Sequence, residues 1–374
     1  MQSASLPKSK TESTSTLKLH SRYPKGGNVD FSLMLRGIVI VAVLLNHYVD
    51  DFMTMDGHDI ANTMVSVFFV LSGYGISASL HQKLGENFSV SSLLGFYRIR
   101  IAKVFPLLWV ALLLESLIAN HVFSISDFLG YKMTEHYWFI SSLLECYLLS
   151  PLLHLLLNYK KNITLAFMTL LFLVSNYAIG QNPELKSALM NFHLTGFPYM
   201  ELYLSNIYLF FGGMYFHHVG RARQTFNIQN QQQLASNTTT QTGQQATGYQ
   251  SILFILLLVS SLSYIFLERF FYSVLPFIGG PVLLAVLSFY ALSMRCTPRF
   301  WLSSAFIYAG RHSLALYLLH MPYFYFLERI NIISIDSLTS IAMSIVLLPL
   351  FFGIALAIEQ LSNTLSNRLI SARL

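Results

Sequence analysis

The stretch LRGIVIVAVLLNHYVDD, residues 35–51, is apolar enough to cross a lipid bilayer, yet it carries Arg36 near its start and His47 near its end. An ionisable side chain inside a membrane helix is costly and usually faces a cavity or a partner. Helical geometry places these two residues about 20° apart around the axis and about 16 Å apart along it. One face of this helix is therefore predicted to carry both groups.

The composition of the 374-residue chain is that of a membrane protein. Hydrophobic residues make up 54% and charged residues 11%, against about 25% charged residues in soluble domains. Residues 1–30 are polar, so no cleavable signal peptide is expected and the first apolar run should remain as a span. The two cysteines, Cys146 and Cys296, are expected to be unpaired thiols, and no metal site is expected.

Ten apolar runs approach the length of about 20 residues that a membrane helix needs. We therefore predict an all-α, multi-pass protein with about ten transmembrane helices. The predicted spans are 31–49, 60–80, 102–120, 137–157, 163–180, 202–218, 251–270, 274–294, 303–327 and 338–361.

The basic residues predict the orientation of these spans. With the amino terminus inside, 19 of the 23 Lys and Arg residues fall on the inner side, so the positive-inside rule places both termini in the cytoplasm. The net charge of +6 thus reflects topology, and no nucleic-acid partner is expected. We predict a cytoplasmic tail over 1–30, a membrane domain over 31–361 and a second tail over 362–374. Within the membrane domain, residues 219–250 are predicted to form a disordered cytoplasmic loop, because 226–250 are rich in Gln, Asn and Thr.

Simpler interpretations of Arg36 and His47 remain open at this point. Arg36 could extend its side chain to the inner headgroups, as a terminal Arg in a span often does. His47 could be an interfacial histidine that bonds Asp50 or Asp51 one turn further on. Their shared face favours a functional role.

Five segments resemble acyltransferase family 3, a family of integral-membrane acyltransferases. LRGIVIVAVLLNH (35–47) is similar to the Arg-to-His first helix of that family, and FFVLSGYGI (68–76) to its second-helix signature. Two positions depart from the family pattern: Lys103 stands where an Arg is usual, and Leu143 stands where one branch has a Glu. The other three similar segments are FYRIRIAKVFPLLW (96–109), YWFISSLLECYLLSP (137–151) and GRHSLALYLLHMP (310–322).

The resemblance implies a multi-pass enzyme of the bacterial cytoplasmic (inner) membrane. It implies transfer of an acyl group, often acetyl, from cytoplasmic acyl-CoA to a hydroxyl of a cell-surface glycan or its lipid-linked precursor. Acyl-CoA would be a co-substrate, and no bound cofactor is expected. His47 is the expected general base, because a histidine near its usual pKa is largely neutral at pH 7. Asp50 or Asp51 could orient it.

Basic and aromatic residues complete the predicted site. Arg98, Arg100 and Lys103 are expected to bind the acyl-CoA phosphates, although inner basic residues can also serve topology alone. His320 should lie at the depth of His47, because it follows Arg311 by about 13 Å along a helix. With Tyr317 it could bind the acceptor or act as a second histidine, or it could be a packed interior histidine.

Three further expectations concern Glu115, Glu145 and the second span. The two acids are expected to pair with basic or polar neighbours, and Gly73 and Gly75 should let helices approach closely. The opposing function is a proton-coupled carrier or flippase, since intramembrane Arg, His and Glu also mark such proteins. The later half has no second copy of the Arg-to-His helix, which disfavours a carrier built from repeats. The acceptor, the acyl group and the oligomeric state are not determined by the sequence.

Overall fold

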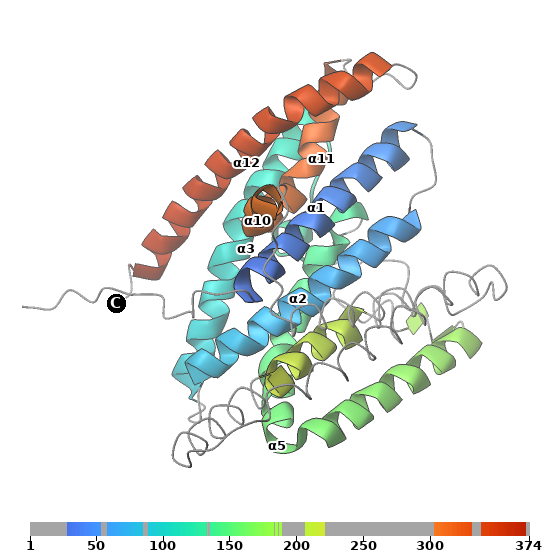
Figure 1. Ribbon diagram of the computed structural model, residues 1–374, viewed down its shortest axis with the longest axis vertical. Helices are drawn as coiled ribbons and strands as arrows, with labels where there is room; N and C mark the ends of the chain where they lie inside the picture. The colour runs from blue at the N-terminus through green and yellow to red at the C-terminus, as the bar shows by residue number, and fades with distance from the viewer. Residues whose placement is uncertain are drawn as a thin grey trace, which may run out of the picture.

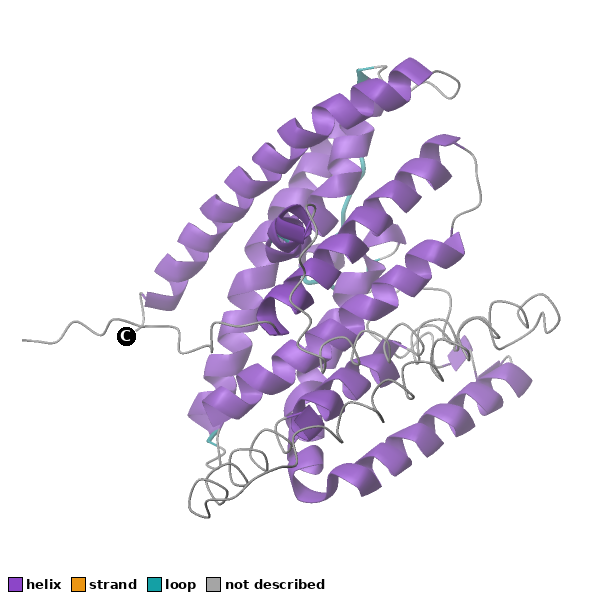
Figure 2. Ribbon diagram, in the orientation of Figure 1, coloured by secondary structure: helices purple, strands orange, loops and turns teal. Residues whose placement is uncertain are grey.

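The described part of the chain consists of helices joined by short loops, with no strand among the described residues, which confirms the predicted all-α class (Figures 1 and 2). The computed structural model describes residues 28–53, 58–84, 89–131, 133, 135–182, 184–185, 187–188, 206–220, 303–330 and 338–371. The predicted spans 251–270 and 274–294, the segment 226–250 and Cys296 lie outside these ranges.

The first two helices follow the predicted spans. Helix α1 covers Asn28–Met53 and α2 covers His58–Leu84, and they pack against each other. Helix α10, Ser303–Arg311, crosses α1 at a point where a glycine stands on each side. A Cβ atom at Gly37 would lie 1.8 Å from the Phe306 carbonyl oxygen, and one at Gly310 would lie 1.8 Å from that of Leu33. Only glycine therefore fits this crossing.

A second close approach joins α2 to the helical residues 206–220. A Cβ atom at Gly73 would lie 1.9 Å from the Phe210 carbonyl oxygen, and one at Gly213 would lie 2.0 Å from that of Val70. Small residues allow membrane helices to approach in this way, because packing and not the hydrophobic effect joins helices in lipid. The predicted role of Gly73 is confirmed.

Helix α3, Val90–Ala119, begins before the predicted span and so includes the basic run at 98–103. Ser89 caps its first turn by accepting a bond from the Ser92 amide, and Asn120 ends it in the left-handed conformation with φ of 57°. It packs against α11, Ser313–Arg329, and α12, Leu338–Ser371.

Helix α5, Trp138–Gln181, contains the two predicted spans 137–157 and 163–180, divided by a sharp kink at Lys160 (φ −148°, ψ 70°). The Thr164 hydroxyl lies 3.0 Å from the carbonyl oxygens of both Leu156 and Lys160. It thus donates a hydrogen bond to backbone carbonyls at the kink, where the regular helical bonds are interrupted. Figure 1 shows a sharp bend in α5 near its label. Before α5 come α4, Ile125–Phe128, and the 3₁₀ turn η1, Glu135–Tyr137.

The single span predicted over 303–327 is wrong: the structure has two helices, α10 and α11, separated at His312. The His312 backbone (φ −106°, ψ 15°) leaves the helical path. Its ring Nδ1 lies 2.7 Å from a carboxylate oxygen of Glu359 on α12. An apolar run shows that a segment is buried, but it does not reveal a turn that a distant helix holds.

Prolines inside the helices release carbonyl groups, and hydroxyl side chains bind them. A proline lacks the amide that would bond the carbonyl four residues earlier. Pro106 thus frees the carbonyl of Ala102, which accepts a bond from Ser366 of α12. Pro151 likewise frees the carbonyl of Tyr147, to which the Ser150 hydroxyl donates over 2.8 Å. Each unpaired carbonyl is thereby satisfied inside the bundle, as lipid requires.

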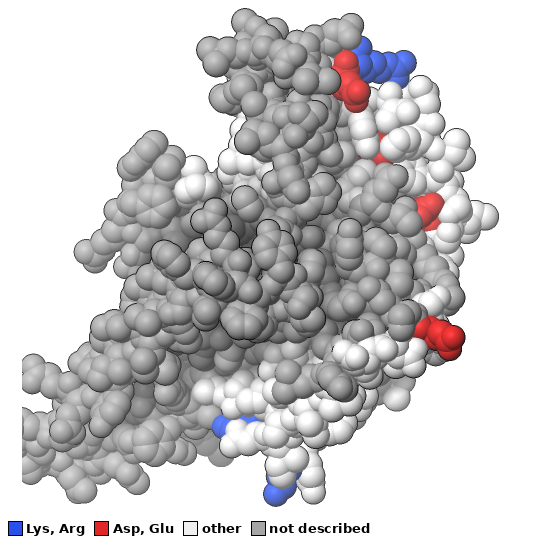
Figure 3. Space-filling view, turned by 90° about the vertical axis from the view of Figure 1, so that its right-hand side faces the viewer, with Lys and Arg blue, Asp and Glu red and all other residues white. Residues whose placement is uncertain are grey.

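Three helices in the described part of the chain are long and apolar enough to cross a membrane: Val90–Ala119, Trp138–Phe172 and Val346–Arg368. Ser32–His47 is a shorter apolar helix. Two contacts join residues that are predicted to lie on the same side of the membrane. Ser366 donates to the Ala102 carbonyl at one end of the bundle, and Arg329 donates to the Ile118 carbonyl at the other end. In Figure 3 uncharged atoms cover most of the described surface between the few charged groups.

Candidate active site

Two predicted histidines meet between α1 and α11. The ring centroids of His47 and His320 lie 5.0 Å apart with the planes tilted by 40°. His320 is fully buried and His47 is partly exposed. We call these two residues the histidine pair. The structure thus brings together the candidate base and the candidate second histidine, which are far apart in the sequence.

The hydrogen bond of His320 determines which of its nitrogens carries the proton. Its Nδ1 contacts the carbonyl oxygen of Tyr317 one turn earlier in α11. A carbonyl can only accept, so Nδ1–H donates, and Nε2 of the neutral ring carries a lone pair. This Nε2 is buried and has no hydrogen-bond partner among the described residues. A buried acceptor without a donor is costly and suits a group that receives a proton or a ligand hydroxyl.

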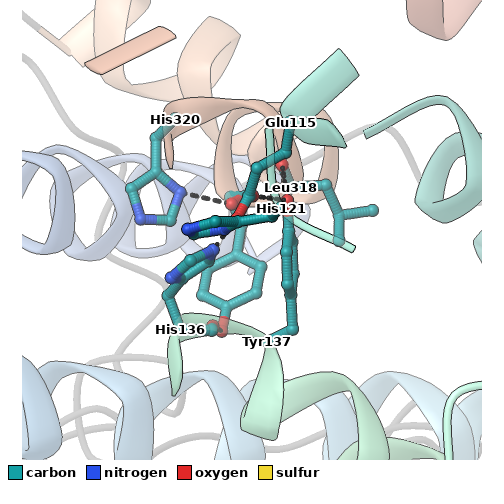
Figure 4. A network of polar contacts seen from close by, with 7 residues as sticks. Glu115, His121, His136, Tyr137, Leu318 and His320 are labelled. Carbon is teal, nitrogen blue, oxygen red and sulfur yellow. Dashed lines mark hydrogen bonds and ion pairs between the residues drawn. The ribbon is translucent and has the colours of Figure 1, made fainter. Parts of the chain in front are cut away.

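A buried carboxylate lies near His320 (Figure 4). Glu115 of α3 is fully buried, and three donors surround it: His121 Nδ1 at 2.8 Å, His136 Nε2 at 3.1 Å and the Tyr137 hydroxyl at 2.8 Å. We call these four residues the Glu115 cluster. An ionised carboxylate only accepts, so all three partners donate to it. The expectation that Glu115 pairs with polar neighbours is confirmed.

The Glu115 cluster contacts the histidine pair through His136, whose ring centroid lies 6.2 Å from that of His320. Two tyrosines hold η1 against α11. The Tyr137 hydroxyl also lies 3.3 Å from the carbonyl of Leu318, which Pro322 has freed, and the Tyr317 hydroxyl donates to the carbonyl of His136. The orientation of His320 therefore depends on residues from α3, η1 and α11.

Arg36 does not extend toward headgroups but bonds inside the bundle. Its guanidinium donates to the Leu71 carbonyl on α2 over 3.0 Å. Gly75 lies beside this group, and a Cβ atom there would make an ordinary van der Waals contact with the guanidinium nitrogen at 3.6 Å. Arg36 thus faces α2 while His47 faces α11, so the shared face predicted from spacing serves two neighbouring helices.

The predicted phosphate-binding residues lie on α3 near Arg36. The Arg100 guanidinium lies 5.3 Å from the centre of the Phe96 ring and 6.0 Å from that of Tyr147. Arg98 is partly buried and Lys103 is exposed. Partial burial, together with the positive charges of Arg100 and Lys103, lowers the pKa of Lys83, which lies beyond the predicted span of α2. A group of positive charges gathers at this end of the bundle.

The sequence analysis gave no role to His136, which directly precedes the predicted span at 137–157, or to Tyr137, the first residue of that span. Helical periodicity in the sequence does not indicate a partner for either residue. Their place in the site is known only from the hydrogen bonds that they donate to Glu115 in the structure. Asp50 and Asp51 lie within α1, but their side chains are outside the described part of the structure. Among the described residues, no group of three or more His, Cys, Asp or Glu side chains could hold a metal ion.

Comparison with known proteins identifies the family. The model of an acyltransferase domain, that of acyltransferase family 3, matches residues 31–360, nearly the whole chain. No curated protein and no solved structure is similar enough to count as a match. The protein is an integral membrane protein of the acyltransferase kind, as its apolar helices and this match agree. The chain therefore belongs to acyltransferase family 3.

Proposed function

We propose that this protein transfers an acyl group, acetyl in the simplest case, from cytoplasmic acyl-CoA to a hydroxyl of a cell-surface or lipid-linked glycan. The observation that carries the proposal is the histidine pair, in which His47 lies 5.0 Å from His320 between two apolar helices. A sugar hydroxyl is a poor nucleophile until a base accepts its proton, and histidine is the usual base near neutral pH. We assign that role to His47.

The donor would bind at the other end of α1. Acyl-CoA carries several phosphate charges, and guanidinium groups bind phosphate through two parallel hydrogen bonds. Arg98, Arg100 and Lys103 supply positive charge on α3, and Arg36 supplies it from α1. The proposed path thus leads from a basic end of the bundle to the histidine pair.

The reaction balances with these residues alone. His47 accepts the proton of the acceptor hydroxyl as its oxygen attacks the thioester carbonyl carbon. A carbon–oxygen bond forms, the carbon–sulfur bond breaks, and CoA leaves as a thiolate. The thiolate then takes the proton from the imidazolium, so His47 returns to its neutral form. Asp50 or Asp51 could hold His47 in the required tautomer, and the placement in the bacterial inner membrane belongs to the same proposal.

The test uses the full-length protein in lipid nanodiscs with acetyl-CoA. Release of free CoA is followed with and without a panel of glycans and lipid-linked sugars, and ester formation is checked by mass spectrometry. We expect acceptor-dependent CoA release. No release with any acceptor, together with uptake of a glycan into vesicles, would assign the protein to the carriers instead.

The same assay tests the base. His47→Ala should lower kcat by about 10²- to 10⁴-fold, the usual contribution of a general base. Insertion and thermal stability of the variant should match those of the wild type, because His47 is partly exposed within the bundle. A variant that keeps its turnover would remove His47 from the mechanism. His218→Ala is the matched control, since the His218 ring contacts His154 of α5 and has no place in the proposed chemistry.

A further inference from the structure

The buried carboxylate of Glu115 has a place in the same site that the family match does not assign. Intramembrane acids are costly, and they are retained where they pair with a group that carries or gains positive charge. The three donors around Glu115 are two histidines and a tyrosine, and none of them is a permanent cation. The carboxylate is thus solvated by polar groups, and its negative charge is left without a fixed positive partner among the described residues.

The neighbours of Glu115 form a continuous path of imidazoles. His136 Nε2 donates to the carboxylate over 3.1 Å, the His136 ring lies 6.2 Å from that of His320, and His320 lies 5.0 Å from His47. Figure 4 shows His136 and His320 turned toward the same region beside Glu115. Because this region is buried, the charge of the carboxylate is poorly screened there.

The tautomer of His320 gives this path a direction. Its Nδ1 donates to the Tyr317 carbonyl, so its Nε2 lone pair is available to accept a proton. The backbone that sets this tautomer is itself fixed by η1, since Tyr317 donates to the His136 carbonyl and Tyr137 contacts that of Leu318. The Glu115 cluster therefore controls both the position of His320 and the electrostatic potential around it.

We propose that Glu115 is a positioning residue that acts through His136 and His320 to stabilise the positive charge formed when the histidine pair takes the proton of the acceptor hydroxyl. The inference rests on the proposed function, and it assigns the pair a shared proton in place of a single isolated base. His47 receives the proton as the carbon–oxygen bond forms, and the Nε2 lone pair of His320 shares it. The CoA thiolate later removes the same proton, so no other reactant is needed.

Several other titratable groups face Glu115 and belong in its pH behaviour. His121 joins the cluster from the loop after α3, and it is 40% exposed, so it links the buried carboxylate to the surface. Tyr325 of α11 faces the cluster, with its ring centroid 5.3 Å from that of His121 and 6.4 Å from that of His136. Arg329 of α11 donates to carbonyls at the end of α3, one turn beyond Glu115.

The test compares Glu115→Gln with the wild type. Glutamine keeps the size and an accepting oxygen but removes the charge. We expect kcat to fall by about 10- to 100-fold, the range seen when an orienting partner of a functional imidazole is lost, while the KM for acyl-CoA stays unchanged. A base must be neutral, so kcat rises with pH as the imidazolium loses its proton. Without the carboxylate the imidazolium is less stable, and this acid limb should move to lower pH.

Two further variants separate an electrostatic from a merely structural role. Glu115→Asp keeps the charge, so it should recover part of kcat and an acid limb near that of the wild type. Glu184→Gln removes an exposed carboxylate beyond the end of α5 and should leave kcat and the limb in place. A fall in kcat with an unmoved acid limb in Glu115→Gln would overturn the proposal.

A second measurement does not depend on turnover. In protein labelled with ¹⁵N-histidine, NMR titration should show Nε2 of His320 unprotonated at neutral pH, with the resonances assigned by His320→Gln and His47→Gln. The protonation midpoint of the pair should be lower in Glu115→Gln and in His136→Gln, which keeps a donor for Glu115 if the first variant does not fold. Equal midpoints in a catalytically active protein would overturn the inference alone. A shifted midpoint without any CoA release would show that Glu115 stabilises the imidazolium, but it would reject the proposed function and with it the catalytic use of that charge.

Discussion

At the scale of single residues, Arg36 shows how a structure changes the meaning of a charge. The sequence allowed it to reach toward lipid headgroups, but its guanidinium donates to the Leu71 carbonyl beside Gly75. A charged donor held inside the bundle is pre-positioned, because little side-chain freedom remains to be lost when a phosphate binds. The structure therefore favours a binding role over an interfacial one.

The prediction for this residue concerns the donor. Arg36→Ala should raise the KM for acyl-CoA by about tenfold or more, since a hydrogen bond to a charged group contributes about 1.5–3 kcal/mol. Steady-state kinetics over a range of acyl-CoA concentrations measures this effect. Arg311→Ala is the control, because Arg311 is an exposed cation at the end of α10 and should leave the KM unchanged. Equal effects in both variants would show that only the overall positive charge matters.

At the scale of the elements, the glycine crossing of α1 and α10 supports the site. Gly37 and Gly310 let the two backbones touch, and α10 leads directly into α11, which carries His320. A displaced α10 would move His320 relative to His47. The position of the histidine pair thus depends on two residues that have no side chain.

The corresponding prediction compares two Gly-to-Ala changes inside helices. Gly37→Ala should destabilise the protein by about 1–3 kcal/mol, the usual cost of overpacking, because the new Cβ atom would lie 1.8 Å from a carbonyl oxygen. Gly212→Ala should instead keep or raise stability by about 0.5–1 kcal/mol, the helix preference of Ala over Gly. No atom lies within 4 Å of a Cβ placed at Gly212. Thermal unfolding in detergent should show the Tm falling in the first variant only.

At the scale of the whole molecule, the basic residues lie toward one end of the helix bundle and the Glu115 cluster lies toward the other. Arg100 and Arg36 lie toward the end where Ser366 meets Ala102. His121 and Arg329 lie toward the opposite end, where α3 stops and α11 finishes. A donor and an acceptor that enter from opposite sides could therefore meet at the histidine pair without sharing an entrance.

This separation predicts that the two ends of the bundle are accessible from opposite sides of the membrane. Val122, 96% exposed after α3, should face outward, whereas Asn158 before the kink of α5 should face the cytoplasm. In a chain whose two native cysteines are replaced by alanine, a membrane-impermeant thiol reagent applied to intact cells should label Val122→Cys. Asn158→Cys should react only after permeabilisation. Labelling of both positions from the outside would contradict the orientation inferred from the basic residues.

The sequence by itself determined the helical class, the membrane environment and the family, because apolar length, charge bias and contiguous motifs are local properties. It also named His47, Arg36 and His320 as candidates, and it separated the spans 137–157 and 163–180 at the place where the structure has the kink of α5. Tertiary structure alone decided that His47 faces His320 and that α10 ends at Arg311, before the turn at His312. It also decided that Glu115 accepts hydrogen bonds from His121, His136 and Tyr137. These are contacts between helices far apart in the chain. Residue periodicity records which face of a helix is buried, but the partner of that face follows only from the packing of the whole bundle.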